Sequence, residues 1–132
     1  MQEQSFVLVV EPYEAVRILL EYMLEDAGYI VHTEADPTSA LGVLSKLRPQ
    51  LILYDTHEPD HIGSAFAHAA HEHDSNLPIV LMTTDSPLSF FPELQDADAC
   101  LFKPFTVQAL YACVAWYCQP QPDSLKQREL GA

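Results

Sequence analysis

Short apolar runs alternate with helix-forming segments along this chain, and this alternation restricts the possible folds more than any other feature. The runs FVLVV at residues 6–10 and LILY at residues 51–54 are continuous and rich in aliphatic residues. Such runs are typical of strands buried on both faces of a sheet. Segments with apolar residues at every third or fourth position follow them. Strands that alternate with helices predict a parallel sheet covered by helices on both faces.

The pattern repeats five times and predicts an α/β domain over residues 1–118, followed by a polar tail at 119–132. Gly28 and the Asp36-Pro37 pair carry the usual signals for a helix end and a helix start. The predicted strands are 6–10, 29–33, 51–54, 79–82 and 99–102. The predicted helices are 14–27, 37–47, 62–73, a weak one within 88–96, and 106–118. The first helix has its predicted core stripe at Val16, Leu19, Leu20, Met23 and Leu24.

Composition restricts the function classes. The chain has 132 residues and a net charge of −13, from 19 acidic against 6 basic residues. This charge disfavours direct binding to nucleic acid, which requires basic surface. Three cysteines without C-x-x-C spacing, and a polar start without a basic segment, predict reduced thiols in the cytoplasm. No apolar run approaches the roughly 20 residues of a membrane span.

Polar residues follow four of the predicted strands. Glu11 ends the first strand, Asp55 the third, Thr83 the fourth and Lys103 the fifth. In open parallel sheets the chemistry occurs at the carboxyl ends of the strands, so these side chains should converge. A carboxylate that accepts a phosphoryl group needs a divalent cation, a fixed positive charge and a hydrogen-bond donor. Glu11, Lys103 and Thr83 could fill these roles around Asp55.

Four motifs in this order resemble the receiver domains of response regulators over residues 5–118. They are VLVVEPYEAVRILL, LILYDTHEPDHIG, LPIVLMTT and DACLFKPFT, the last with a cis-proline expected at Pro104. The resemblance implies a flavodoxin-like doubly wound (βα)5 fold with a five-stranded parallel sheet in the order 2-1-3-4-5. It also implies that a histidine kinase or phosphotransfer protein phosphorylates Asp55. A Mg²⁺ ion would be held by Glu11, Asp55 and the backbone carbonyl of His57.

The chain departs from the family pattern in three places. Pro12 stands where the family has a second acid, so Mg²⁺ binding should be weakened or absent, with Glu14 as a possible substitute ligand. Cys100 stands at the position of the aromatic switch residue. The segment between Thr83 and Lys103 is shortened and contains two prolines, which disfavour a helix there.

Two main functions remain open on the sequence. One is a stand-alone receiver in phosphorelay signal transduction, which is not an enzyme and signals through protein contacts. The other is a pseudo-receiver that is never phosphorylated and works by partner binding or dimerisation. A small hydrolase with an aspartyl nucleophile fits less well, because the chain has no insertion to cover a substrate.

Two further features have more than one reading. The last helix is apolar on most of its surface, so it forms either a homodimer or partner contact, or a surface covered by the tail. The contact residues would be Tyr111, Ala115, Trp116 and Cys118. His68 and His71 are spaced to share a helix face. An ordinary polar face of a helix is a commoner explanation for such a pair than a transition-metal site.

Overall fold

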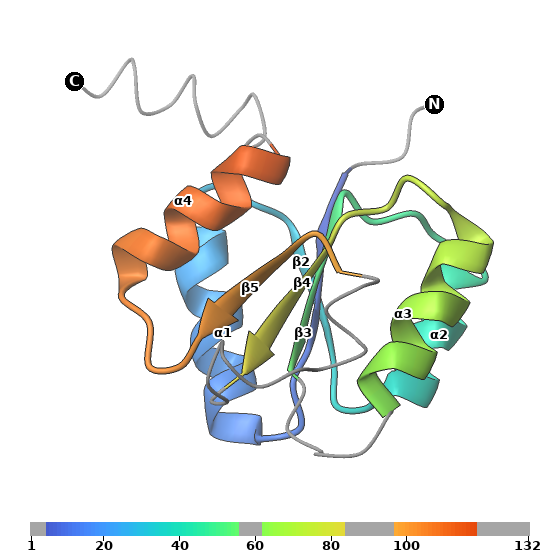
Figure 1. Cartoon of the computed structure of the whole chain (residues 1–132). Coiled ribbons are helices and arrows are strands. Elements are labelled where there is room, and N and C mark those ends of the chain that lie inside the picture. The colour runs from blue at the N-terminus through green and yellow to red at the C-terminus, as the bar shows by residue number, and fades with distance from the viewer. Residues whose placement is uncertain (1–4, 56–61, 84–96, 119–132) are drawn as a thin grey trace.

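The described residues form a five-stranded parallel sheet with two helices on each face (Figure 1). The structure is a computed structural model and describes residues 5–55, 62–83 and 97–118. The strands are β1 (Val7–Val10), β2 (Val31–Glu34), β3 (Leu51–Asp55), β4 (Ile79–Thr83) and β5 (Ala99–Phe102). The helices are α1 (Glu14–Asp26), α2 (Pro37–Leu44), α3 (Ile62–His73) and α4 (Val107–Tyr117). The predicted helix within 88–96, the tail at 119–132 and His57 lie outside the described residues.

The strand order is β2-β1-β3-β4-β5 and all neighbouring pairs are parallel, which confirms the predicted fold class. The three central strands are buried along their whole length, as their continuous apolar runs predict. The predicted start of the second strand at residue 29 is wrong, because Tyr29 and Ile30 precede the segment that pairs with β1. The strand begins instead at Val31, which pairs with Val7.

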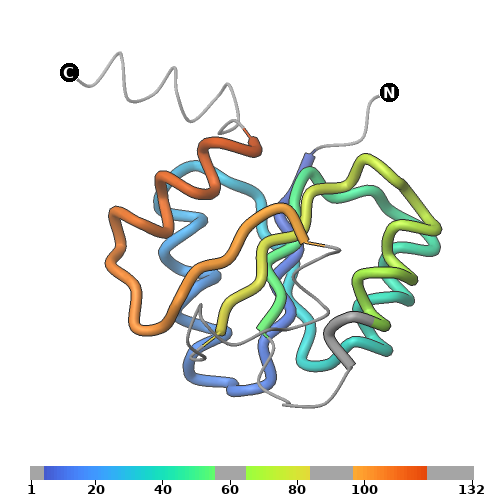
Figure 2. The backbone as a smooth tube through the Cα atoms, in the orientation of Figure 1, coloured from blue at the N-terminus to red at the C-terminus, as the bar shows by residue number. Residues whose placement is uncertain are grey.

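Two apolar clusters hold the helices against the sheet. One lies between the sheet and helices α2 and α3 and includes Leu8, Ile52 and Phe66. The other lies under α1 and α4 and includes Leu53 and Leu110. The tube in Figure 2 shows α1 and α4 side by side, and the Tyr111 hydroxyl of α4 donates a hydrogen bond to the Met23 carbonyl oxygen of α1 at 2.9 Å. Successive side chains of a strand point to opposite faces of the sheet, so each of the three central strands contributes apolar residues to both clusters.

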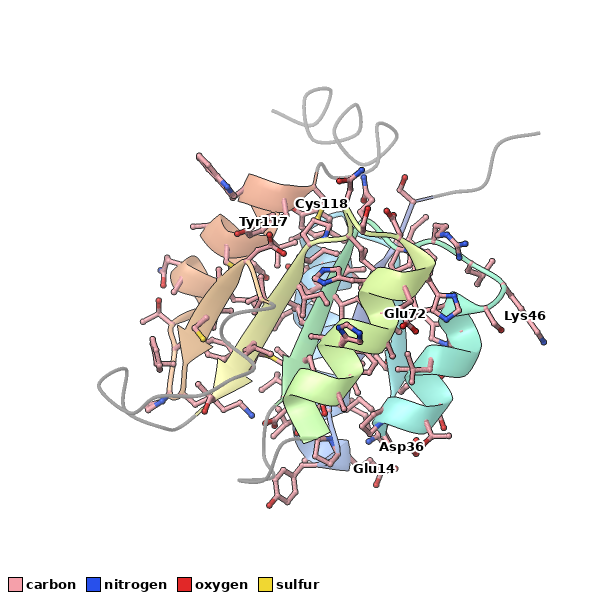
Figure 3. The ribbon with its side chains drawn as sticks, turned by 45° about the vertical axis from the view of Figure 1, so that its right-hand side comes forward. Glu14, Asp36, Lys46, Glu72, Tyr117 and Cys118 are labelled. Atoms are coloured by element: carbon pink, nitrogen blue, oxygen red, sulfur yellow. The ribbon has the colours of Figure 1, made fainter. Side chains whose placement is uncertain are left out.

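Local signals set the helix boundaries. The Asp36 carboxylate accepts the Ser39 N–H at 2.8 Å and caps α2, with Pro37 next in the chain. Figure 3 shows Asp36 and Lys46 at opposite ends of this helix. The helix ends at Leu44 rather than at residue 47, so Leu47 lies beyond it and is partly exposed. Gly28 after α1 has φ 102°, the left-handed region expected of a glycine at a helix end.

Two predictions about helix surfaces need correction. Leu19 was expected in the core stripe of α1 but is 53% exposed, because Leu20 and Leu24 take the inward positions. Cys118 was expected on the outer surface of the last helix but is buried, because it lies four residues after the buried Val114 and packs into the cluster under α1 and α4. None of the described helices is long and apolar enough to cross a membrane.

Candidate functional site

The site is built at the carboxyl ends of the strands, where the fold brings together Glu11, Asp55, Thr83 and Lys103. Glu11 directly follows β1, and Asp55 and Thr83 are the last residues of β3 and β4. The Lys103 backbone N–H donates to the Thr83 carbonyl oxygen at 2.7 Å, which extends the β4–β5 pairing by one step. The following Lys103-Pro104 peptide is cis, as expected.

Lys103 joins the two carboxylates. Its Nζ lies 2.6 Å from Asp55 Oδ2 and 3.2 Å from Glu11 Oε1. These contacts link three residues that are far apart in the sequence. The site therefore contains one ammonium group between two carboxylates, and the convergence predicted from the strand ends is confirmed for these three side chains.

Burial makes the electrostatics of this cluster strong. The Glu11 side chain is fully buried and that of Asp55 is 4% exposed, whereas that of Lys103 is 20% exposed. Burial raises the pKa of Glu11 above its ordinary value, and a hydrogen-bond interaction with Asp55 raises it further. Burial by itself would lower the pKa of Lys103, but its hydrogen bond with Asp55 and the charges of both carboxylates raise that pKa. Two carboxylates with one lysine leave a local deficit of positive charge.

This donor set fits a divalent cation that prefers oxygen ligands. Glu11 and Asp55 supply two buried carboxylates at one point of the sheet edge, as Mg²⁺ sites require. The third expected ligand, the His57 carbonyl, lies outside the described residues. Glu14 is exposed in the first turn of α1 and forms no ion pair with the described residues, so the structure gives no support to it as a substitute ligand.

The loop after β1 has Glu11 and Pro12 where the family resemblance implies two acids. Pro12 offers no carboxylate, and Glu11 is held instead by its neighbours. Its Oε2 accepts the Tyr13 N–H at 3.1 Å, so both carboxylate oxygens have protein partners. Arg17 donates from Nη1 to the carbonyl oxygens of Glu11 at 2.9 Å and of Pro12 at 3.4 Å.

Arg17 is the residue near the site that the sequence analysis missed. The available signal was its place near the start of a helix, where a positive charge opposes the helix dipole. Thr83 is where it was predicted, at the end of β4, and is buried with 5% exposure. Cys100 packs against the cluster under α2 and α3. In residues 5–55, 62–83 and 97–118, no group of three or more His, Cys, Asp or Glu is placed to hold a metal ion, so His68 and His71 gain no support as ligands.

Comparison with known proteins gives the family. The model of the response regulator receiver domain matches residues 7–115, most of the chain. The chain belongs to the response regulator receiver family. Sporulation initiation phosphotransferase F of Bacillus subtilis is 27% identical over 113 residues, which is 84% of this chain and 91% of that protein. The sensor histidine kinase RcsC of Salmonella typhi is 29% identical over 119 residues, which is 89% of this chain but only 13% of the kinase.

Solved receiver structures have the same fold. The chemotaxis protein CheY4 of Vibrio cholerae superposes with a TM-score of 0.76 at 28% identity, covering 88% of this chain and all of the other. The receiver domain of the sensor histidine kinase PA1611 from Pseudomonas aeruginosa PAO1, with a coordinated magnesium ion, gives a TM-score of 0.77 at 24% identity. It covers 87% of this chain and 98% of that one. At this lower identity the second likeness shows the fold alone. The chain is thus a receiver of two-component signalling.

Proposed function

We propose that this receiver accepts a phosphoryl group on Asp55 and passes the signal on through protein contacts. The contact of Lys103 Nζ with Asp55 Oδ2 at 2.6 Å carries the proposal, because it places a fixed cation on the nucleophile. The donor would be a phosphohistidine of a histidine kinase or phosphotransfer protein. An Asp55 oxygen attacks phosphorus, the phosphorus–nitrogen bond breaks, and the histidine leaves with the bonding pair and takes up a proton.

The other residues of the site would assist this transfer. Glu11 and Asp55 would hold a Mg²⁺ ion, whose chemistry is to neutralise charge on the phosphoryl oxygens. The Lys103 ammonium would pair with the same oxygens once Asp55 carries the phosphoryl group. The Thr83 hydroxyl, at the end of the adjacent strand, would donate a hydrogen bond to the phosphoryl group. Each protein molecule would take up one phosphoryl group on Asp55 and would not be regenerated by that step. We therefore regard it as an acceptor rather than an enzyme.

We retain the predicted role of a stand-alone regulator or phosphorelay intermediate as part of this proposal. We retain the predicted cytoplasmic location as part of this proposal. The three cysteines, which form no disulfides, are consistent with a reducing compartment.

The exposed face of α1 is the surface that we propose for the phosphate donor. Ile18, Leu19 and Tyr22 are 56%, 53% and 67% exposed, and Tyr13 before the helix is 51% exposed. Acidic residues flank this apolar centre at Glu14, Glu21, Glu25 and Asp26. An apolar centre with an acidic rim complements a partner helix with an apolar stripe and basic flanks. The same rim would repel a second copy of this chain, whose net charge is −13.

We also propose a homodimer contact on the last helix, through fewer exposed residues than the four predicted. Trp116 is 81% exposed and Ala115 is also exposed. Tyr111 is half-buried against α1, and Cys118 is buried. A contact through the four predicted residues would therefore centre on Trp116. The substitution Trp116→Glu should abolish self-association in sedimentation if this contact exists, and an unchanged sedimentation coefficient for a dimeric protein would exclude it.

One observation favours the alternative of a pseudo-receiver. Both Glu11 carboxylate oxygens already have protein partners, and Pro12 provides no ligand. The substitution Pro12→Asp separates the two functions, because it restores a carboxylate beside the site. Under the phosphoacceptor proposal, Mg²⁺ binds the wild type weakly and Pro12→Asp binds it more tightly in a calorimetric titration. No binding to either protein would favour the pseudo-receiver.

Phosphorylation itself is tested by intact mass after incubation with a small acyl phosphate and Mg²⁺. The wild type should gain one phosphoryl group, and Asp55→Asn should gain none. Lys103→Arg provides a matched variant that keeps the positive charge but changes its geometry, and it should react more slowly. Equal labelling of the wild type and Asp55→Asn would refute Asp55 as the acceptor.

A further inference from the structure

The turn between β1 and α1 is fixed by an arginine whose role the family resemblance does not assign. Arg17 lies in the first turns of α1, where the helix dipole disfavours a cation. Its guanidinium nevertheless extends back past the helix start to the carbonyl oxygens of Glu11 and Pro12, at 2.9 Å and 3.4 Å. An unfavourably placed charge that bridges two carbonyls of one turn indicates a specific function for the side chain.

The bridged turn is the one that orients Glu11. The Glu11 N–H donates to the Glu34 carbonyl oxygen at 3.0 Å, which holds its backbone to β2. Its Oε2 accepts the Tyr13 N–H at 3.1 Å across the turn, and its Oε1 receives Lys103 Nζ at 3.2 Å. The turn in this shape places the Glu11 carboxylate on the Lys103 ammonium, which also contacts Asp55. Pro12 restricts one backbone angle of the turn but contributes no side-chain hydrogen bond.

We propose that Arg17 is a positioning residue of the phosphoacceptor site, which holds the Glu11–Tyr13 turn so that the Glu11 carboxylate meets Lys103 and Asp55. Outer residues that fix a ligand's orientation commonly matter nearly as much as the ligand itself. In this chain the carboxylate that the family has at position 12 is missing, so the single remaining acid of the turn depends on its orientation. The part of the proposal that concerns Mg²⁺ rests on the proposed function. The part that concerns the turn does not.

A matched control exists elsewhere in the chain. Arg48 makes the same kind of contact at the end of α2, where its Nη1 donates to the carbonyl oxygens of Leu44 at 2.6 Å and Leu47 at 3.4 Å. Arg48→Met therefore removes one guanidinium and two similar contacts without touching the site. Arg17→Met removes them at the site, and Arg17→Lys keeps the charge while replacing the planar guanidinium that bridges the two carbonyls.

The first experiment follows the Tyr13 amide proton by NMR in the metal-free protein. In Arg17→Met this proton should exchange with solvent about fivefold faster, the size of effect expected for one hydrogen bond, and its resonance should move upfield. Arg17→Lys should show a smaller change in the same direction. In Arg48→Met the Tyr13 amide should behave as in the wild type. An unchanged Tyr13 amide in both Arg17 variants would overturn the proposal.

The second experiment measures Mg²⁺ affinity and separates position from charge. Both Arg17→Met and Arg17→Lys should weaken binding, Arg17→Met by roughly tenfold, while Arg48→Met stays at the wild-type value. If Arg17 acted by charge alone, Arg17→Met would bind Mg²⁺ more tightly and Arg17→Lys would equal the wild type, which would refute the positioning role. A wild type that binds no Mg²⁺, together with a responsive Tyr13 amide, would remove the phosphoacceptor function and leave the role of Arg17 in the turn intact.

Discussion

Removing the Lys103 ammonium should destabilise the protein, and should do so more as the pH rises. Lys103→Met keeps the apolar stem but leaves Glu11, which is fully buried, and Asp55, whose side chain is 4% exposed, without their shared cation. Breaking a buried ion pair on one side costs about 3–5 kcal/mol. We expect about 3 kcal/mol at about pH 8, at the lower end of that range, because the lysine itself is 20% exposed.

The pH dependence follows from the direction of the Glu11 pKa. This pKa is raised in the folded protein above its ordinary value of 4.5, first by burial and then by Asp55. The native state therefore binds the proton more tightly than the unfolded chain, and stability falls as pH rises through the window above 4.5. Loss of Lys103 raises the pKa further and widens this window. The cost of Lys103→Met should then shrink to about 1 kcal/mol near pH 5, where a proton replaces the ammonium.

Urea unfolding of the wild type and Lys103→Met at the two pH values measures this effect. Lys46→Met serves as the control, since Lys46 is exposed and forms no ion pair with the described residues, and it should change stability by less than about 0.5 kcal/mol. Adding Asp55→Asn to Lys103→Met should recover about 2 kcal/mol, because it removes one of the two unpaired charges. A destabilisation by Lys103→Met that is equal at both pH values would refute the electrostatic account.

Three further predictions concern the frame around the site. Gly28→Ala should cost about 2 kcal/mol in urea unfolding, because φ at Gly28 is 102°, and no loss of stability would contradict this backbone argument. Asp36→Ala should cost about 1 kcal/mol and Asp36→Asn much less, since only the second keeps an acceptor for the Ser39 N–H; equal losses would exclude the cap. Burial, with a smaller contribution from Cys113, raises the pKa of Cys118 to about 11, so alkylation near pH 8 should be about a hundredfold slower in native protein than in urea. Equal rates in the two conditions would contradict that prediction.

The sheet and the site were both predictable because the site residues lie at the ends of the apolar runs that form the strands. A strand buried on both faces is apolar along most of its length, so a charged residue at its carboxyl end stands out, as Glu11 after β1 and Asp55 at the end of β3 do. The parallel order then requires these strand ends to share one edge of the sheet. Lys103 follows β5, an edge strand that is only partly buried, so its assignment depended on the shared sheet edge and on the family resemblance. Its short contacts with both carboxylates could be learned only from the structure.

The errors arose where periodicity does not distinguish inside from outside. Leu19 and Leu20 both fit a helical stripe, and only packing against the sheet selects Leu20. Arg17 was missed for a different reason. Its partners are backbone carbonyls, and because every residue possesses such an acceptor, the sequence does not identify them. The only sequence signal for Arg17 was its place near the start of a helix.

The most direct test of the phosphoacceptor function is to locate the phosphoryl group on the chain. The wild type is incubated with a small acyl phosphate and Mg²⁺, the product is reduced with borohydride to convert an acyl phosphate into a stable alcohol, and peptides are mapped by mass spectrometry. We predict conversion at Asp55 alone, and its loss in Asp55→Asn. A label on another residue, or an unmodified Asp55 after treatment with both the acyl phosphate and a phosphorylated histidine phosphotransfer protein, would contradict the account.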